Sequence, residues 1–244
     1  ILNVILFYHI ITLKHFTMLK NKKTYYQLIL DKSGSMHDCV DTTINGFNEQ
    51  MQMIRSLKNK YPQQEFVVSL TTFNQEVNFD INQEDPDNIK ELTSSANFQD
   101  YEKDNNLINY WPDGMTALYD AIGMSVNNIL NLAKEEITND LASVVVVIIS
   151  DGHENASTKY SYDQIQSMIK ELELSENWTF SYLSNTPDAV DYAMRINIKK
   201  ENAIRYSKSS LNHDYEDIKF SMAHYCDSKE NNIKTKTFLK SRRK

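Results

Sequence analysis

Three oxygen-bearing side chains follow one apolar run near the start of the chain. Asp31, Ser33 and Ser35 come directly after residues 28–30, so a carboxylate and two hydroxyls share one turn at the carboxyl end of a predicted strand. Hard divalent cations such as Mg²⁺ prefer oxygen ligands of this kind. Neither serine lies in the G-x-S-x-G turn that presents a nucleophile, and Ser33 stands where aspartyl-phosphate hydrolases have a second carboxylate. The cluster therefore favours cation binding over nucleophilic catalysis.

Two further residues complete a pattern with this turn. Thr116 lies in the run D-G-M-T-A-L-Y-D, and Asp151 follows the apolar run 144–149 and precedes Gly152. The order D-x-S-x-S, then T, then S-D-G resembles the metal-ion-dependent adhesion site (MIDAS) of von Willebrand factor A-type domains. The resemblance covers residues 25–207, and segments 116–122 and 183–189 resemble a subset of stand-alone bacterial members. The three pieces together, in this order, make the signal specific.

The resemblance implies a role for each of five residues. Ser33, Ser35 and Thr116 would contact the cation through their hydroxyls, while Asp31 and Asp151 would act through bound waters. Outer carboxylates of this kind hold a cation and orient its waters. One coordination position would accept a Glu or Asp of a protein partner, with Mg²⁺ as the expected cation and Mn²⁺ as the alternative. In the plain structural alternative, the serines form a turn, Thr116 caps a helix and Asp151 ends a strand.

Side chains next to the motif are candidates for a rim that contacts the partner. Lys32 would attract acidic partners, although a solvated lysine is the ordinary case. His153 is an unfavourable soft-metal ligand because no second His or Cys stands beside it at ligand spacing. Tyr110 and Trp111 either pack their loop or form a binding hot spot, and Asp120 is expected to support its helix. The predicted rim consists of Lys32, His37, Trp111, His153 and Glu154.

The composition is that of a globular protein with an acidic balance. The 244 residues carry a formal net charge of -7, with 41% hydrophobic and 24% charged residues. This charge disfavours nucleic acid as the main partner, because basic surfaces bind phosphate backbones. The two cysteines, Cys39 and Cys226, do not form a disulfide framework, which favours a reducing compartment, and we expect a cytoplasmic location.

The chain divides into three segments. Residues 1–17 contain an apolar run that is too short for a membrane helix and lacks the pattern of a signal peptide. We interpret them as upstream or non-native sequence, with a membrane or partner anchor as the alternative. Residues 18–230 form the predicted von Willebrand factor A-type domain, and residues 231–244 form a basic tail that we expect to be solvated. We expect no membrane span and a monomer.

Strand and helix patterns alternate along the predicted domain. Strands are expected at 25–30, 66–73, 77–81, 143–149, 178–183 and 203–206, and helices at 41–54, 116–134, 162–174, 188–196 and 211–225. The run 143–149 is typical of a central parallel strand, whereas the turn at 74–76 predicts an antiparallel hairpin. Residues 82–115 are interpreted as a long irregular connection with one short helix near 89–92. The fold class is therefore α/β, with a doubly wound, Rossmann-like, mostly parallel central sheet, one antiparallel edge strand and helices on both faces.

The motif predicts a divalent-cation-dependent protein-binding module that is not an enzyme. One alternative is an accessory subunit of a partner ATPase complex, since the chain has no G-x-x-x-x-G-K-[ST] loop of its own. A metal-dependent phosphohydrolase ranks lower, because it needs a positioned general base and His153 and Glu154 are the candidates. In adhesion-receptor members of the resembling family, ligand binding moves the last helix. A similar switch of 211–225 is a further hypothesis.

Overall fold

The computed structural model describes residues 23–94, 107–206, 211–231, 233, 235 and 237–240. The strands are β1 (Lys23–Asp31), β2 (Glu65–Phe73), β3 (Val77–Glu84), β4 (Glu91–Thr93), β5 (Leu107–Asn109), β6 (Ala142–Ser150), β7 (Trp178–Ser184) and β8 (Ala203–Arg205). Six of them form one sheet in the order β3-β2-β1-β6-β7-β8, in which only β2 and β3 are antiparallel neighbours. Strands β4 and β5 form a separate parallel pair.

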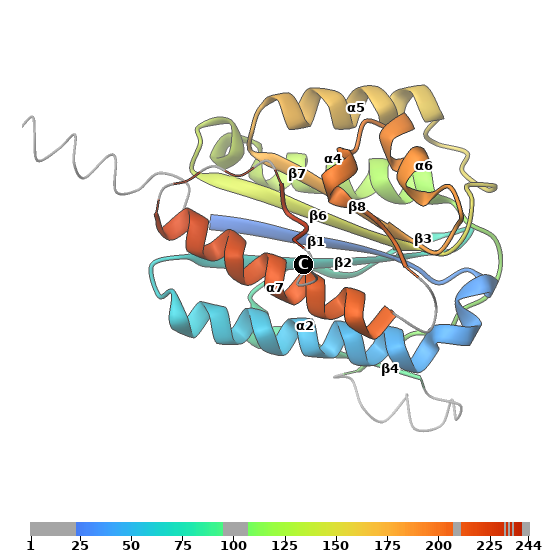
Figure 1. The fold of residues 1–244 in the computed structure, drawn as a ribbon, viewed down its shortest axis with the longest axis horizontal. Coiled ribbons are helices and arrows are strands. Elements are labelled where there is room, and N and C mark those ends of the chain that lie inside the picture. The colour runs from blue at the N-terminus through green and yellow to red at the C-terminus, as the bar shows by residue number, and fades with distance from the viewer. Residues whose placement is uncertain are drawn as a thin grey trace, which may run out of the picture.

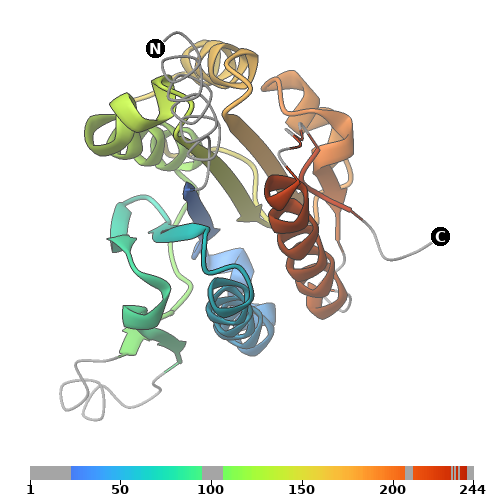
Figure 2. The same ribbon diagram turned by 90° about the vertical axis from the view of Figure 1, so that its left-hand side faces the viewer.

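Helices cover both faces of the six-stranded sheet. They are η1 (Gly34–Cys39), α2 (Val40–Lys60), η2 (Pro86–Asn88), α4 (Leu118–Thr138), α5 (Tyr162–Leu174), α6 (Ala189–Arg195), η3 (Lys200–Asn202) and α7 (Leu211–Glu230), where η marks a 3₁₀ helix. Helices α4, α5 and α6 lie over one face, and α2 and α7 lie over the other (Figures 1 and 2). The predicted fold class is confirmed, including the antiparallel edge strand β3.

The central strands supply side chains to two hydrophobic cores. Leu28 and Leu30 of β1 belong to the core beneath α2 and α7, whereas Ile29 belongs to the core beneath α4, α5 and α6. Strand β6 is buried along all of its nine residues because helices cover both of its faces. Each fully buried aliphatic side chain stabilises the fold by about 1.5–3 kcal/mol relative to exposure. The two strands that carry Asp31 and Asp151 at their ends are therefore the most firmly held part of the sheet.

The connection between β3 and α4 is more ordered than its sequence indicates. The predicted short helix near 89–92 is wrong, because these residues lead into strand β4 and the helical turn η2 lies before them. Arg55 of α2 donates to the carbonyl of Ile89 at 2.9 Å, and the side chain of Asn48 exchanges two hydrogen bonds with the backbone of Leu92, at 3.0 and 2.9 Å. Side chains of α2 therefore satisfy backbone groups that a helix would have paired internally.

The segment after α7 returns to the domain. Phe238 and Leu239 are buried, and Oδ1 of Asn202 accepts both of their backbone N–H groups, at 2.8 and 3.3 Å. The N–H of Lys240 donates to Oγ of Ser221 in α7 at 2.8 Å. Residues 237–240 thus depart from the expectation of a solvated tail, because two apolar side chains between the basic residues find a buried position.

Some sequence-based interpretations fall outside the described residues. The apolar segment 1–17 and the tail positions 232, 234, 236 and 241–244 are among these. Within the part of the chain that the structure describes, no helix is both long and apolar enough to cross a membrane.

A half-buried lysine fastens the carboxyl end of α7. Nζ of Lys229 donates to the carbonyl of Lys23 at 2.9 Å, to Oγ1 of Thr24 at 2.8 Å and to Oγ of Ser143 at 2.9 Å. The hydroxyl of Tyr225 donates to the same Ser143 oxygen at 2.7 Å. Burial lowers the pKa of Lys229 to about 7, because the ammonium group loses its hydration. The last helix is therefore bound to the amino ends of β1 and β6 through an amine whose charge depends on pH.

Lys229→Met should remove a pH-dependent part of the free energy of unfolding. The unfolded chain keeps the lysine proton up to a pKa of about 10.4, whereas the folded chain loses it above about pH 7. Unfolding therefore takes up a proton in this range. Lys229 should make the free energy of unfolding rise with pH by up to about 1.4 kcal/mol per pH unit.

Urea unfolding of the wild type and of Lys229→Met between about pH 7 and about pH 9 measures this contribution as the difference between the two proteins. Lys134→Met, at an exposed position of α4, is the matched control. A wild-type advantage that stays constant or falls as the pH rises would contradict a lowered pKa for Lys229.

Candidate metal site

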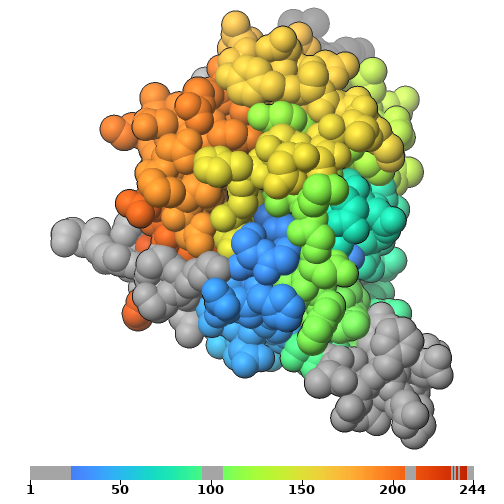
Figure 3. Space-filling view, turned by 90° about the vertical axis from the view of Figure 1, so that its right-hand side faces the viewer, coloured from blue at the N-terminus to red at the C-terminus, as the bar shows by residue number. Residues whose placement is uncertain are grey.

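Three loops meet at the carboxyl edge of the sheet. Strands β1 and β6 are adjacent and parallel, with Leu30 opposite Ile149, so Asp31 and Asp151 leave the sheet side by side. The loop before α4 joins them, since the N–H of Gly34 donates to the carbonyl of Gly114 at 3.1 Å. Figure 3 shows the three segments, in blue, green and yellow, in contact on one face of the molecule. Motif residues that are distant in the sequence therefore come together.

Asp31 is the buried centre of this edge. Its Oδ1 accepts the backbone N–H of Ser33 at 2.7 Å, and its Oδ2 accepts the hydroxyl of Ser150 at 2.6 Å. Burial raises the pKa of Asp31 to about 6, because the charged form loses hydration, and the hydrogen bonds from Ser150 and Ser33 oppose this rise. Since both oxygens already accept hydrogen bonds from the protein, the carboxylate is suited to holding the loop and not to direct contact with a cation.

The other four motif residues form one polar cluster. Oγ of Ser33 lies 3.2 Å from Oγ of Ser35, and the Ser35 hydroxyl donates to Oδ1 of Asp151. Thr116 faces the same place, because a Cβ built at Gly152 would lie 3.0 Å from Oγ1 of Thr116 and 3.6 Å from Oγ of Ser35. Glycine at position 152 therefore leaves the space between these hydroxyls open.

This donor set fits a hard divalent cation. Hydroxyl and carboxylate oxygens are the ligands that Mg²⁺ and Mn²⁺ prefer, whereas Zn²⁺ prefers histidine and cysteine. Within the described ranges, no group of three or more His, Cys, Asp or Glu side chains is arranged to hold a metal ion. A cation at this edge would therefore depend on Ser33, Ser35 and Thr116 for direct contacts.

Two asparagines that the sequence analysis missed hold Thr116 in place. Nδ2 of Asn74 donates to Oδ1 of Asp113 at 2.6 Å, and the Asn74 carbonyl accepts the N–H of Ala117 at 2.7 Å. Oδ1 of Asn155 accepts the N–H of Thr116 at 2.8 Å, and the N–H of Asn155 donates back to the Thr116 carbonyl at 3.0 Å. Asparagine just after β2 and again shortly after β6 was the available signal, since this residue commonly bonds nearby backbone.

Gly114 shapes the same loop. Its φ of +72° lies in the left-handed region, and a Cβ there would lie 1.9 Å from Oε1 of Gln75. That amide oxygen accepts the N–H of Met115 at 3.0 Å. These contacts keep Thr116 outside the helix, so α4 begins at Leu118, two residues later than predicted.

The aromatic pair before Thr116 divides between two roles. Tyr110 is buried, and its hydroxyl donates to the Asp31 carbonyl at 2.7 Å. Trp111 is 48% exposed, and its ring meets the ring of His37 edge-on, with the centroids 5.3 Å apart. Tyr110 therefore packs the loop, as the ordinary interpretation expected, while Trp111 faces outward beside the motif.

Among the remaining rim candidates, Glu154 uses both carboxylate oxygens in hydrogen bonds within the domain. Its Oε2 accepts the N–H of Tyr119 at 2.9 Å and the hydroxyl of Ser157 at 2.7 Å, while its Oε1 accepts the N–H groups of residues 156 and 157 at 2.9 and 2.7 Å. It therefore caps α4 and holds the loop that follows Asp151. Asp120 likewise supports structure, because it accepts the backbone N–H groups of residues 158–160 at 2.8–3.0 Å.

Lys32 and His153 lie at the outer border of the site. Nε2 of the exposed His153 is 3.7 Å from Oδ1 of Asp188 at the start of α6. Burial raises the pKa of Asp80 in β3, and the Thr72 hydroxyl and the charge of Lys32 oppose that rise. The positive charge of Lys32 thus acts on the β3 side of the motif.

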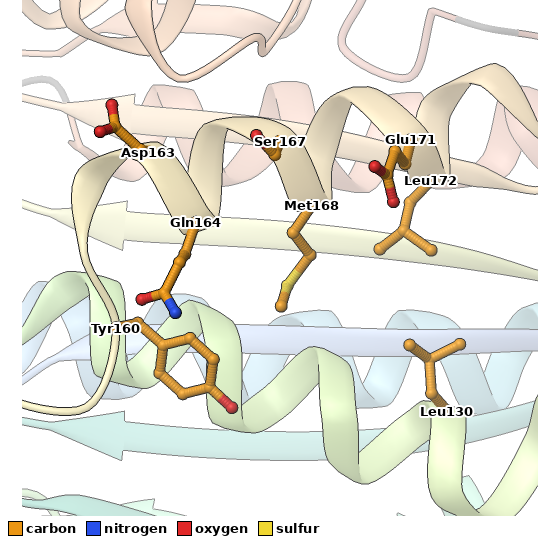
Figure 4. Close-up of a pocket in the computed structure, with 8 residues that line it drawn as sticks. All are labelled: Leu130, Tyr160, Asp163, Gln164, Ser167, Met168, Glu171 and Leu172. Carbon is orange, nitrogen blue, oxygen red and sulfur yellow. The ribbon is translucent and has the colours of Figure 1, made fainter.

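A hollow lies between α4 and α5, away from the candidate metal site. Its volume is about 610 Å³. Met168 and Leu172 of α5 point toward Leu130 of α4, and Tyr160 lies at one end (Figure 4). None of the residues that line it belongs to the predicted metal site or rim.

No protein-family model and no curated protein sequence matches this chain. Solved structures do match. Proximal thread matrix protein 1 from the mussel byssus, with its MIDAS motif occupied by zinc, is 15% identical with a TM-score of 0.52, and the match covers 85% of this chain and 46% of that chain. The PilB minor pilin from Streptococcus sanguinis is 14% identical with a TM-score of 0.50, and the match covers 83% of this chain and 62% of that chain. A von Willebrand factor type A structure from Catenulispora acidiphila is 11% identical with a TM-score of 0.48, and the match covers 83% of this chain and 43% of that chain.

These similarities concern the fold. This chain spans less than two thirds of each of the solved chains, and the identities are low. The chain has the fold of von Willebrand factor A-type domains, as the D-x-S-x-S, T and S-D-G pieces predicted.

Gly152→Val should weaken Mn²⁺ binding by about tenfold or more. The new side chain would enter the space beside Oγ1 of Thr116 and Oγ of Ser35. Gly34→Ala is the matched control, because a Cβ there would meet only the backbone of Gly114, at 3.6 Å. Isothermal titration with Mn²⁺, with circular dichroism to check folding, compares the two. Equal affinities would show that the hydroxyls do not bind the cation beside Gly152.

Proposed function

We propose that this chain is a divalent-cation-dependent protein-binding module. The observation that supports the proposal is the convergence of the hydroxyls of Ser33, Ser35 and Thr116 with the carboxylates of Asp31 and Asp151 at one edge of the sheet. The three hydroxyls would hold the cation directly, and the two carboxylates would act through water. The bound cation would supply an electrophilic position that captures a Glu or Asp of a protein partner.

In the proposed site, Asp31 holds the loop in place, and the hydroxyl ligands leave the cation able to attract a partner carboxylate. Asp31 fastens the backbone of Ser33 and the hydroxyl of Ser150, so the loop has little to reorganise when a cation binds. Neutral hydroxyl ligands leave the positive charge of the cation available to a partner carboxylate. We propose Mg²⁺ as the cation, with Mn²⁺ as a substitute. The zinc in the MIDAS motif of the mussel protein supports a divalent cation in a site of this type.

The rim of the proposed site consists of Lys32, His37, Trp111 and His153. These side chains surround the motif and, apart from the half-buried Lys32, are exposed. Glu154, which the sequence placed in the same rim, is omitted because its oxygens cap α4.

The proposed activity is binding without catalysis. A metal-dependent hydrolase needs a base beside the attacking water. Glu154 accepts four hydrogen bonds from its own loop and from α4, so this candidate base is engaged elsewhere. Nε2 of His153 lies 3.7 Å from Oδ1 of Asp188, at the start of α6. An accessory subunit of an ATPase complex would use the same binding chemistry toward one particular partner.

The cysteines agree with a reducing compartment. Cys39 and Cys226 are both buried, and neither forms a disulfide within the described part of the chain. Burial raises the pKa of the Cys226 thiol to about 12, which makes it unreactive. We therefore propose a cytoplasmic location. We further propose that the module is a monomer, and that its partner is a protein and not a nucleic acid, in keeping with the net charge of -7.

Thr116→Val should reduce the affinity for Mn²⁺ by about tenfold or more, because it replaces a ligand hydroxyl by a methyl group of the same shape. Isothermal titration measures the affinity. Thr158→Val, at an exposed position of the loop before α5, is the matched control. The same variants should differ in the capture of partners from a host lysate.

The wild type and Thr158→Val should capture a partner in Mg²⁺ and release it in EDTA, while Thr116→Val should capture little. Capture that survives both EDTA and Thr116→Val, together with unchanged Mn²⁺ affinity, would mean that the motif is structural in this chain.

A further inference from the structure

The surface beside the proposed cation is apolar at one place. Trp111 is 48% exposed and Met115 is 54% exposed, and both lie in the short loop that leads to Thr116. The exposed ring of His37 packs edge-on against Trp111. We call Trp111, Met115 and His37 the apolar patch. Half-exposed tryptophan is costly to leave in water and is the residue most enriched at binding hot spots.

The loop that carries the apolar patch is fixed by the fold. The N–H of Asp113 donates to the carbonyl of Lys32 at 2.8 Å, and the N–H of Gly34 donates to the carbonyl of Gly114 at 3.1 Å. The N–H of Met115 donates to Oε1 of Gln75 at 3.0 Å. Trp111 is therefore presented to solvent by a fixed backbone, and a partner that covers it need not order the loop.

The apolar patch borders the hydroxyl cluster. Met115 directly precedes Thr116, and His37 follows Ser35 by two residues. A partner side chain on the apolar patch would thus come from a residue near the one that reaches the hydroxyl cluster.

Charges near the apolar patch restrict what else the partner carries. Asp38 and Asp113 are both exposed and lie next to patch residues, and the whole chain carries a net charge of -7. A run of acidic residues would be repelled here, while one carboxylate would be attracted by a bound cation.

We propose that the partner presents a single acidic residue with a large apolar side chain nearby in its sequence, and that this apolar side chain packs on Trp111 and Met115. The proposal rests on the proposed function and adds the chemical class of its partner. The cation fixes the carboxylate, and the apolar patch selects which carboxylate-bearing segment binds. Trp111 is a specificity residue in this scheme and does not contact the cation.

The test uses the full chain and a displayed peptide library with one fixed aspartate flanked by randomised positions. Peptides are selected in Mg²⁺ and eluted with EDTA. The wild type should enrich an aromatic or long aliphatic residue near the aspartate, and acidic runs should be depleted. A synthetic peptide of the enriched sequence should bind Trp111→Ala at least about tenfold more weakly than the wild type.

Two measurements separate this inference from the proposed function. Mn²⁺ titration of Trp111→Ala should give the wild-type affinity, because Trp111 is not a ligand. Phe220→Ala, an aromatic truncation at a 45% exposed position of α7, should bind the peptide as the wild type does. Binding should also shift the tryptophan fluorescence, and since Trp178 is only 2% exposed, the shift reports on Trp111.

Metal-dependent selection without an apolar preference, or a selected peptide that binds Trp111→Ala as tightly as the wild type, would overturn the inference and leave the proposed function standing. Selection that ignores EDTA would overturn the proposed function, and the inference with it.

Discussion

The buried carboxylate of Asp31 is the interaction on which the site depends. Removing a carboxylate from water is costly unless hydrogen bonds satisfy it, and here the Ser33 N–H and the Ser150 hydroxyl do so. These two donors come from the ends of neighbouring parallel strands. One carboxylate therefore sets the start of the first loop and joins it to the strand that delivers Asp151. The positions of the Ser33 and Ser35 hydroxyls follow from this junction.

The last helix, α7, packs in the hydrophobic core beneath the loops of the candidate site. Tyr215 of α7 belongs to the same core as Met36, Cys39 and Tyr110, which lie in or beside the loops of the candidate site. At its other end α7 is held by Lys229 and by the returning segment 237–240. A shift of this helix, as the switch hypothesis requires, would disturb the buried amine and the bond between Lys240 and Ser221.

Much of the site follows from the sequence because the ligand types are local. The D-x-S-x-S turn, Thr116 and the S-D-G turn each stand at the end of a recognisable strand or before a recognisable helix, and the sheet brings strand ends together. Other parts depend on contacts between distant residues. Asn48 and Arg55 of α2 bind the backbone of Leu92 in β4 and of Ile89 just before it, and Asn202 and Ser221 bind the backbone of residues 238–240. No local pattern in those segments records these partners.

The sequence by itself determined the kind of sheet and the oxygen donors, because strand periodicity and short motifs are properties of neighbouring residues. Only the tertiary structure decided how adjacent side chains are used. Tyr110 turns inward to the Asp31 carbonyl while Trp111 turns outward to His37. Glu154 lies three residues from Asp151, and its carboxylate caps α4. Such choices depend on which donors and rings the fold brings alongside, and these come from segments far away in the chain.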